Sequence, residues 1–199
     1  PDPQALWPKA NASLWKRAEA RYQRDGGGGA WSFSDSLPKR WELAFHDLKF
    51  HVRPTDFKHL GLFPEQAINW DWMREKVKAA NRPIAALNLF GYTGVASLIA
   101  AKSGAEVIHV DSSRPALTWG KENQRTTHLE NTKIHWIHDD AQKFVEKETR
   151  RGHLYDAVIM DPPAFGRGIN GEIWNFEKDI EGLLEKTINL LAPDPVFFV

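Results

Sequence analysis

The sequence contains no cysteine among its 199 residues. This absence excludes disulfides, thiolate nucleophiles and cysteine-bound zinc within the sequence, and it fits a reducing compartment. No apolar run approaches the roughly 20 residues that a membrane-spanning helix needs. Polar residues also interrupt the first stretch, where the apolar core of a signal peptide would lie. We therefore expect a cytoplasmic protein.

Net charge of either sign is also lacking, because 26 Lys and Arg balance 26 Asp and Glu. The sequence therefore has no overall basic field that would attract nucleic acid, although a local patch is compatible with this balance. The eight histidines show no repeated spacing typical of metal ligands, and we predict no metal site. What the sequence does have is the composition of a globular domain, with 42% hydrophobic and 26% charged residues.

The first 60 residues predict a small N-terminal α+β subdomain. Residues 4–24 carry apolar and charged residues at helical spacing, and the four glycines at 26–29 should end that helix in a loop or hinge. Two β-like segments, 41–45 and 48–52, are joined at His46-Asp47 and predict a hairpin. A helix over 65–80 then begins just after Pro64.

Strand and helix patterns alternate through the remainder, which we predict to be a second domain over 61–199. Continuous apolar strands separated by helices indicate a doubly wound, mostly parallel α/β sheet of the Rossmann-like type, whose ligand should lie at the carboxyl ends of the strands. The predicted strands are 84–90, 107–110, 134–137, 154–160 and 196–199, and the predicted helices are 95–102, 116–129, 141–149 and 176–191.

The first of these strands runs into a glycine-containing turn and then a helix. Gly91 and Gly94 lack side chains where a turn must be tight and a ligand must approach the backbone. With only two glycines, the turn does not match the Gly-x-Gly-x-x-Gly dinucleotide pattern, so NAD loses support while another nucleotide-bearing ligand remains allowed. A βα turn without a ligand is the plain alternative.

Acidic residues follow the second and third strands. Asp111 lies about 20 residues beyond the glycine turn, a position suited to accepting hydrogen bonds from ribose hydroxyls. It could instead help to cap the helix that starts near Ser113 and Pro115. Asp140 could accept from an adenine amino group or serve as a helix N-cap, and both roles remain open.

The fourth strand ends in the most specific motif, Asp161-Pro162-Pro163-Ala164-Phe165. The two prolines fix a rigid turn at the edge of the sheet. Asp161 could orient a donor amine there, and Phe165 could stack on a ring. The glycine-rich segment 166–171 that follows predicts a mobile substrate loop, in which Arg167 could meet a phosphate, or else an ordinary surface loop.

Together these segments resemble motifs I, II and IV of class I S-adenosylmethionine-dependent methyltransferases. The nearest resemblance is to the bacterial RlmI-like 23S rRNA cytosine-C5 methyltransferases and their uncharacterised relatives, and it spans about 61–199. It includes Gly61-Leu62-Phe63-Pro64-Glu65-Gln66, similar to a segment that precedes motif I in that family. The resemblance implies an enzyme that transfers a methyl group from S-adenosyl-L-methionine to RNA, in rRNA processing.

The resemblance also implies roles for individual residues. The acceptor side would be formed by Asp161, Pro162, Pro163 and Phe165. The cofactor would be bound by Phe63, Gln66, Asn88, Phe90, Gly91, Tyr92, Thr93, Gly94, Asp111, Ser112, Asp140 and Ala141. Two other readings stay open: a methyltransferase that acts on a small molecule or a protein, and a nucleotide-binding module without catalysis.

The C-terminal strand 196–199 carries a further expectation. Enzymes of this resemblance have two more strands after the fifth, so we expect Val199 to lie on an outer strand of an excerpt from a longer chain. Cytosine-C5 methylation needs a thiolate, and the resemblance would place that cysteine in the absent C-terminal segment.

Overall fold

The structure is a computed structural model of the chain and describes residues 11–25, 28–56 and 58–199. It divides into two compact units, one of residues 1–41 and 52–60 and the other of residues 42–51 and 61–199. Residues 42–51, which we predicted within the N-terminal subdomain, thus group with the larger unit. The predicted boundary after residue 60 stays a prediction.

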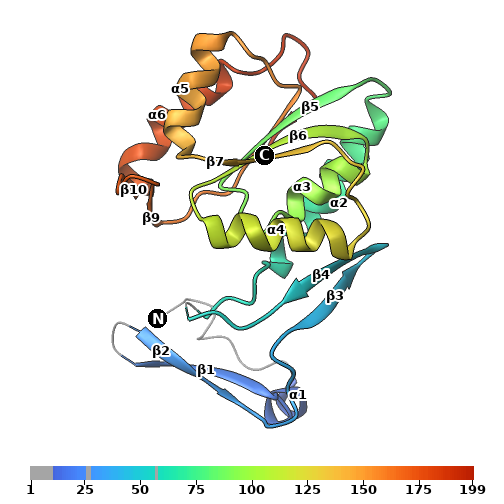
Figure 1. The fold of residues 1–199 in the computed structure, drawn as a ribbon, viewed down its shortest axis with the longest axis vertical. Coiled ribbons are helices and arrows are strands. Elements are labelled where there is room, and N and C mark those ends of the chain that lie inside the picture. Colours follow the sequence, from blue (N-terminus) through green and yellow to red (C-terminus); the bar gives the residue numbers. More distant parts are fainter. Residues whose placement is uncertain (1–10, 26–27, 57) are drawn as a thin grey trace. The chain divides into compact units, whose positions relative to one another are not determined.

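The larger unit is built on a five-stranded sheet with the strand order β11-β8-β5-β6-β7 (Figure 1). Each neighbouring pair is parallel. This is the doubly wound α/β sheet that the alternating pattern predicted, because parallel strands need helical crossovers between them. The strands are β5 (Ile84–Leu89), β6 (Ala105–Asp111), β7 (Ile134–His138), β8 (Ala157–Met160) and β11 (Phe197–Phe198).

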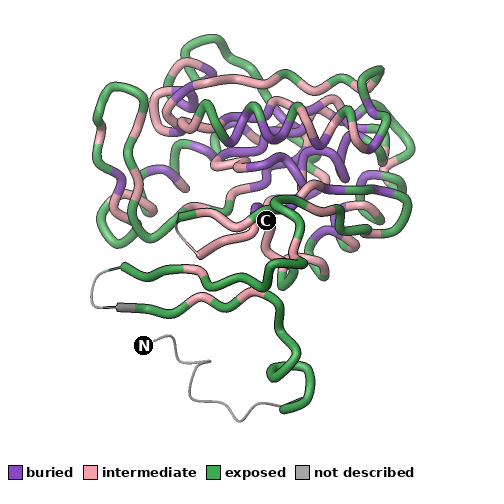
Figure 2. The backbone as a smooth tube through the Cα atoms, turned by 60° about the horizontal axis from the view of Figure 1, so that its bottom comes forward, coloured by how far each residue is buried: buried purple, intermediate pink, exposed green. Residues whose placement is uncertain are grey.

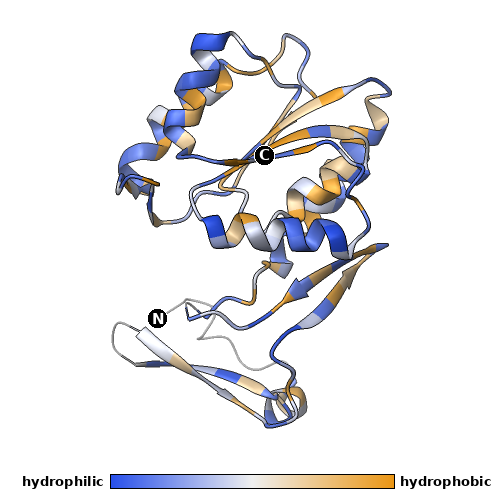
Figure 3. Ribbon diagram, in the orientation of Figure 1, coloured by the Kyte–Doolittle hydropathy of each residue, from blue (hydrophilic) through white to orange (hydrophobic). Residues whose placement is uncertain are grey.

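Helices cover both faces of this sheet and divide the core in two (Figure 1). Helices α2 (Ala67–Ala79), α3 (Val95–Lys102) and α4 (Arg114–Thr126) lie on one face, whereas α5 (Ala141–Arg151) and α6 (Phe176–Ile188) lie on the other. The buried residues concentrate along the strands and the inner helix faces (Figure 2), and the strands are the most apolar stretches of the ribbon (Figure 3). A sheet buried on both sides explains why its strands read as continuous apolar runs.

The helix starts follow from the local sequence. Ser113 precedes α4 and its hydroxyl accepts a hydrogen bond from the Ala116 amide at 3.3 Å, with a proline in the first turn. Asp140 precedes α5 and accepts from the Lys143 amide at 3.0 Å. Such caps satisfy amide groups that have no partner within the helix. The short 3-10 helix η2 (Pro64–Gln66) leads into α2.

The predicted hairpin over 41–52 is confirmed. Strands β3 (Trp41–Phe45) and β4 (Leu48–Val52) form a two-stranded sheet, and His46 between them has a positive φ of 51°. Leu48 and Phe50 are buried and belong to the core that includes α2 and α3. Burial of alternate residues of β4 explains its period-two pattern.

In the smaller unit, the helix predicted over residues 4–24 is wrong for most of the described residues. Over residues 11–25, the described part of this segment, only α1 (Ala12–Lys16) is helical, and β1 (Ala20–Asp25) follows and pairs antiparallel with β2 (Gly28–Phe33). The physical reason is cross-strand pairing of aromatic residues, which favours a strand over the helical spacing. Two of the four glycines predicted as a loop, Gly28 and Gly29, lie in β2. Residues 4–10, 26 and 27 lie outside the described residues.

The segment predicted over 166–171 as a mobile substrate loop, or else an ordinary surface loop, is mostly the turn of a hairpin, and its mobility stays a prediction. The structure has a hairpin here, in which β9 (Phe165–Arg167) pairs antiparallel with β10 (Ile173–Asn175). Its turn is ordered by Glu172, whose backbone carbonyl accepts from the Gly168 amide at 2.8 Å and whose carboxylate accepts from the Asn170 amide at 2.8 Å. Side-chain contacts of this kind are not visible in a glycine-rich pattern.

The C-terminal strand lies where we predicted it. Among the described residues, strand β11 pairs only with β8 and is an outer strand of the sheet. Strand β3 does not pair with that edge, because it pairs with β4 in a separate two-stranded sheet.

Candidate active site

The glycine turn leaves β5 in an unusual backbone conformation. Phe90 and Tyr92 have positive φ angles of 56° and 51°, and Gly94 has a φ of 81° and precedes α3. Non-glycine residues with positive φ are uncommon, and such residues cluster at binding and catalytic sites. The strain therefore distinguishes this turn from an ordinary βα connection.

A buried polar network supports the turn from beneath. The Asn88 amide donates to the Ser97 hydroxyl at 2.8 Å, and that hydroxyl is 2.9 Å from Nδ1 of His109. All three side chains are buried. A Cβ at Gly91 would lie 2.3 Å from the His109 ring, so only glycine fits there. Burial lowers the pKa of His109 to about 3, and the ring is therefore neutral.

A tryptophan makes a similar demand on Gly94. A Cβ at Gly94 would lie 2.6 Å from the Trp136 ring, and a Cβ at Gly120 would lie 2.4 Å from it. The Trp136 indole donates to the Gln124 side chain at 3.0 Å, which fixes the orientation of its ring. The turn and helix α4 thus both approach the same two atoms of this ring, Cζ3 and Cη2.

Asp111 ties the end of β6 to the glycine turn. One carboxylate oxygen accepts from the Tyr92 amide at 2.8 Å and the other from the Ser113 amide at 2.7 Å. Burial raises the pKa of Asp111, and these two amides act in the opposite direction. Because Ser113 caps α4, Asp111 is not the cap itself. Each carboxylate oxygen retains a lone pair that a hydroxyl group can reach.

At the end of β7 the structure assigns Asp140 its capping role, through the Lys143 amide described above. The neighbouring Asp139, which the sequence analysis did not single out, is buried, accepts from the Asp140 amide at 3.0 Å and pairs with Lys147. Two adjacent carboxylates thus mark this strand end, of which Asp140 is the more accessible.

A small pocket lies between the ends of β6 and β7 and the β9–β10 hairpin. Its volume is about 40 Å³, far below the roughly 300 Å³ of common ligand sites. Its lining includes six predicted site residues, Phe90, Asp111, Ser112, Asp140, Ala141 and Pro163, together with Val110, Asp139, Gly166, Arg167, Gly168 and Trp174.

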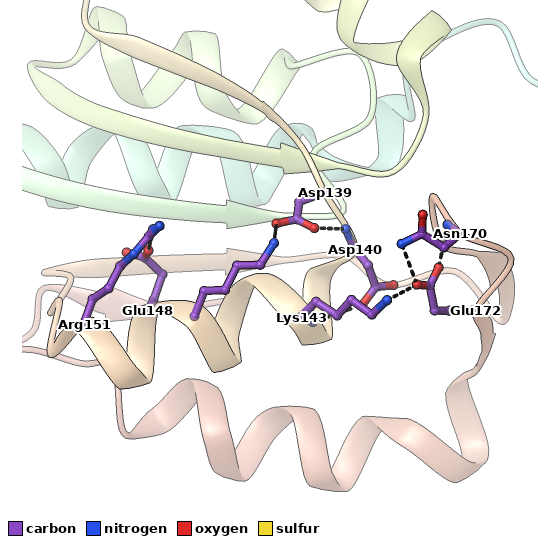
Figure 4. Close-up of polar contacts among 8 residues, drawn as sticks. Asp139, Asp140, Lys143, Glu148, Arg151, Asn170 and Glu172 are labelled. Atoms are coloured by element: carbon purple, nitrogen blue, oxygen red, sulfur yellow. Dashed lines mark hydrogen bonds and ion pairs between the residues drawn. The ribbon is translucent and has the colours of Figure 1, made fainter.

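The β9–β10 hairpin closes this pocket through polar contacts (Figure 4). Glu172 forms an ion pair with Lys143 of α5 and accepts from the Asn170 side chain at 3.2 Å. These donors lower the pKa of Glu172 to about 2. At the tip, a Cβ on Gly168 would lie 2.8 Å from the Asp140 carboxylate. The hairpin therefore rests directly on the carboxylate that was predicted to meet adenine.

Pro163 of the Asp-Pro-Pro motif lines the same pocket. The Trp174 indole donates to the Pro163 carbonyl at 2.6 Å, and its ring is 5.0 Å from that of Phe90. Asp161 accepts from the Gln66 side chain at 3.4 Å. Desolvation, reinforced by the charge of Glu65, raises the pKa of Asp161. The motif thus joins the glycine turn to the hairpin.

Several predicted site residues do not line the pocket. Asn88 is 2% exposed and acts within the core, while the Thr93 hydroxyl donates to the Gly61 carbonyl. The Phe63 ring lies 5.9 Å from that of Tyr92. Phe165 is 73% exposed. Contacts of these residues with a cofactor or an acceptor stay predictions, as do those of Gln66, Gly91, Gly94 and Pro162.

Sequence reasoning missed the residues that support the site. His109, Trp136 and Trp174 were passed over because a lone histidine or tryptophan in an apolar strand has no distinguishing spacing. Gly91 and Gly94 were the one available signal for the first two, because a turn that requires glycine indicates a large side chain packed against its backbone. In the described part of the chain, no group of three or more His, Cys, Asp or Glu is arranged to hold a metal ion.

No helix in the described residues is both long and apolar enough to cross a membrane.

The family model for S-adenosylmethionine-dependent methyltransferases matches residues 8–198. Among curated proteins, a ribosomal RNA large subunit methyltransferase K/L from Pseudoalteromonas translucida is 36% identical over 147 residues, which cover 73% of this chain and 20% of that protein. One from Shewanella frigidimarina is 31% identical, with the same shares covered. The chain thus spans about a fifth of the length of these relatives.

Solved structures agree with the fold. An S-adenosylmethionine-dependent methyltransferase from Agrobacterium tumefaciens superposes with a TM-score of 0.91 at 45% identity, covering 98% of this chain and 63% of that one. A putative methyltransferase, SMU.776, solved in complex with S-adenosylhomocysteine, has a TM-score of 0.69 at 23% identity over 82% of this chain and 42% of that one. With its parallel sheet, strained glycine turn and strand-end carboxylates, the chain belongs to the S-adenosylmethionine-dependent methyltransferase family.

Proposed function

We propose that this chain is the cofactor-binding part of an enzyme that methylates a base of ribosomal RNA. One observation carries the proposal: a single pocket is lined by the ribose-side Asp111, the adenine-side Asp140 and Pro163 of the acceptor motif. A nucleoside and an acceptor would therefore meet at one sheet edge. Bound there, S-adenosylmethionine supplies an electrophilic methyl group on its sulfonium.

The side chains present fit a nucleoside chemically. Asp111 retains acceptor capacity for ribose hydroxyls, Asp140 offers a carboxylate oxygen toward an amino group, and Phe90 adds an aromatic surface. The pocket volume does not yet fit, because the hairpin turn rests on Asp140. We expect the β9–β10 hairpin to move outward when the cofactor binds, which requires opening the Lys143–Glu172 ion pair.

On the acceptor side, the chain positions groups without forming a covalent intermediate. Asp161 would accept a hydrogen bond from an amino group of the acceptor, and Phe165 would stack on its ring. The rigid prolines hold both at a fixed place.

RNA as the substrate is supported by the names of the curated relatives, which are ribosomal RNA methyltransferases. We further propose a cytoplasmic location, where ribosomal RNA is available, and a boundary after residue 60 between an N-terminal subdomain and the methyltransferase domain. A small-molecule or protein acceptor, and a nucleotide-binding module without catalysis, are the alternatives that the test must separate.

The test is transfer of tritiated methyl from S-adenosylmethionine by the purified protein, with total RNA and a metabolite pool supplied in parallel. Label in RNA supports the proposal, and the Asp161→Asn variant should lose it. Label in metabolites or protein alone would replace the RNA assignment. Cofactor binding without any transfer would favour the non-catalytic module.

A further inference from the structure

The charges of the chain are unevenly divided, although their total is zero. Residues 1–41 and 52–60, which form the smaller unit, contain nine Lys and Arg against five Asp and Glu, a net charge of +4. The larger unit therefore carries −4. A local excess of positive charge on a small unit attracts polyanions and is lost in the average over the whole sequence.

One face of the β1–β2 hairpin in this unit carries a row of aromatic rings. In the register, Tyr22 opposes Trp31 and Ala20 opposes Phe33, so these four side chains share a face. The rings of Trp31 and Phe33 are stacked, with centroids 5.9 Å apart and planes 13° apart. Tyr22 meets Trp31 edge to face at 5.4 Å.

The row is held rigidly and is open at one end. The Trp31 indole donates to the Thr55 carbonyl at 2.8 Å, which fixes its ring. At the other end of the row, the Tyr22 ring covers Gly29, where a Cβ would lie 2.6 Å from it. Phe33 remains 52% exposed. Arg24, opposite Gly29, shares this face and is exposed.

We propose that this ring row, Tyr22, Trp31 and Phe33 with Arg24, binds single-stranded nucleic acid. An unpaired base would extend the stack on Phe33, and Arg24 would contact a phosphate. Fixed aromatic rings beside a cation are the arrangement that binds single strands without reading sequence. The positive charge of the unit favours a polyanion over a neutral protein partner. None of these residues belongs to the methyl-transfer site, so the inference goes beyond the proposed function.

The test is fluorescence anisotropy of labelled oligouridine with the whole chain and no cofactor present. We expect binding that weakens with salt, and about a tenfold loss in Phe33→Ala, because stacking contributes about 1–3 kcal/mol per base. Phe33→Trp keeps an aromatic ring at this position and should bind about as tightly as the wild type. Leu14→Ala is the matched control, since Leu14 is an aliphatic residue of the same unit and is 58% exposed.

Charge is tested with Arg24→Glu, which should weaken binding and reduce its salt dependence. Lys39→Glu makes the same charge change outside the ring row and should have the smaller effect. Oligothymidine should bind like oligouridine, because a ring row does not read the sugar. A duplex of the same length should bind less tightly, since its bases offer no free face.

Wild-type affinity in Phe33→Ala would overturn the proposal, as would equal binding of duplex and single strand. A change in sedimentation of Phe33→Ala without a change in nucleic-acid binding would assign the rings to a protein interface instead. Cofactor binding, measured by calorimetry on the same variants, should be unchanged. Failure of this surface is therefore distinguishable from failure of the proposed methyl transfer.

Discussion

The two sides of the site are built in contrasting ways. On the cofactor side, Gly91 lies on the buried His109 ring and Asp111 accepts two backbone amides. On the acceptor side, Phe165 is 73% exposed, and the turn of the hairpin over the pocket is held by the partners of Glu172 and by the Ser112 hydroxyl, which donates to the Arg167 carbonyl at 3.0 Å. The first side is fixed by the core, whereas the turn of the hairpin is held by polar contacts near the surface and only the base of the hairpin is anchored in the core, through Trp174.

This difference suggests a division of labour. The cofactor has a constant shape, and a pre-formed turn can bind it. Packing of the core holds that turn in its strained conformation. An acceptor must enter and leave, and the hairpin turn beside its site can open with a small loss of free energy. Exposed ion pairs in general contribute only about 0–1 kcal/mol. Substitutions on the cofactor side should therefore alter binding strongly, and those on the hairpin should alter it weakly.

The largest effect is expected for Gly91→Ala. The new Cβ would clash with the buried His109 ring, and overpacking of this kind costs about 1–3 kcal/mol or more. We expect cofactor affinity to fall about a hundredfold in calorimetry. Adding His109→Ala should recover much of it by making room. Gly182→Ala, where a Cβ meets nothing within 4 Å, is the matched control and should bind normally.

Next comes Asp111→Ala, which removes the acceptor of the Tyr92 and Ser113 amides as well as the proposed ribose contact. Cofactor binding should weaken by about 1.5–3 kcal/mol, the range for hydrogen bonds to a charged group. Asp111→Asn keeps one acceptor oxygen and should lose less. Undiminished binding of Asp111→Ala in calorimetry would remove the ribose role.

Asp161→Asn tests the other side of the comparison. The amide matches the carboxylate in shape but not in charge, so kcat should fall about tenfold or more while the cofactor dissociation constant stays nearly unchanged. Both are measured on the same preparation, by methyl transfer and by calorimetry. An equal loss of cofactor affinity would place Asp161 on the cofactor side.

The buried histidine predicts a pH dependence of stability. Its folded-state pKa of about 3 lies below the ordinary 6.5, so the unfolded chain takes up a proton that the folded chain does not. The stability this confers is complete above pH 6.5 and is lost as pH falls toward 3, by about 1.4 kcal/mol per pH unit. Urea unfolding at several pH values should show a shallower dependence of stability on pH in His109→Gln than in the wild type.

The smallest effect is expected at the hairpin. Lys143→Met breaks the ion pair with Glu172 while preserving the length of the side chain. Because solvent screens this surface pair, opening the pocket should become only slightly easier, and cofactor affinity should rise by no more than a few-fold. Lys186→Met breaks a comparable pair with Glu146 on α6 and serves as control. Tighter binding in both variants, or weaker binding in the first, would contradict a hairpin that opens.

The parallel sheet with its alternating helices was predictable from sequence, because a sheet buried on both faces requires strands that are continuously apolar. The N-terminal helix was wrongly predicted because Leu14, Ala18 and Arg21 fit helical spacing, and this spacing does not reveal the pairing of β1 with β2. In the site, the carboxylates at strand ends were predictable from position. The hairpin that closes the pocket was not predictable. Glu172 contacts Lys143 of another element and Asn170 of its own turn, and neither contact leaves a periodic pattern in the sequence.

One tryptophan restricts which sequences this fold can accept. Because the Trp136 ring fills the space in front of both Gly94 and Gly120, the three positions are coupled, although they lie in a turn, a helix and a strand. Gly120 weakens the interior of α4 by about 1 kcal/mol relative to alanine, and that weakness is compensated only while the ring is present. A chain that replaces Trp136 with a small residue would be free to regain alanine at 120, whereas Gly94 would still be required by its positive φ. Substitution at these sites therefore has an order, with the tryptophan changing first.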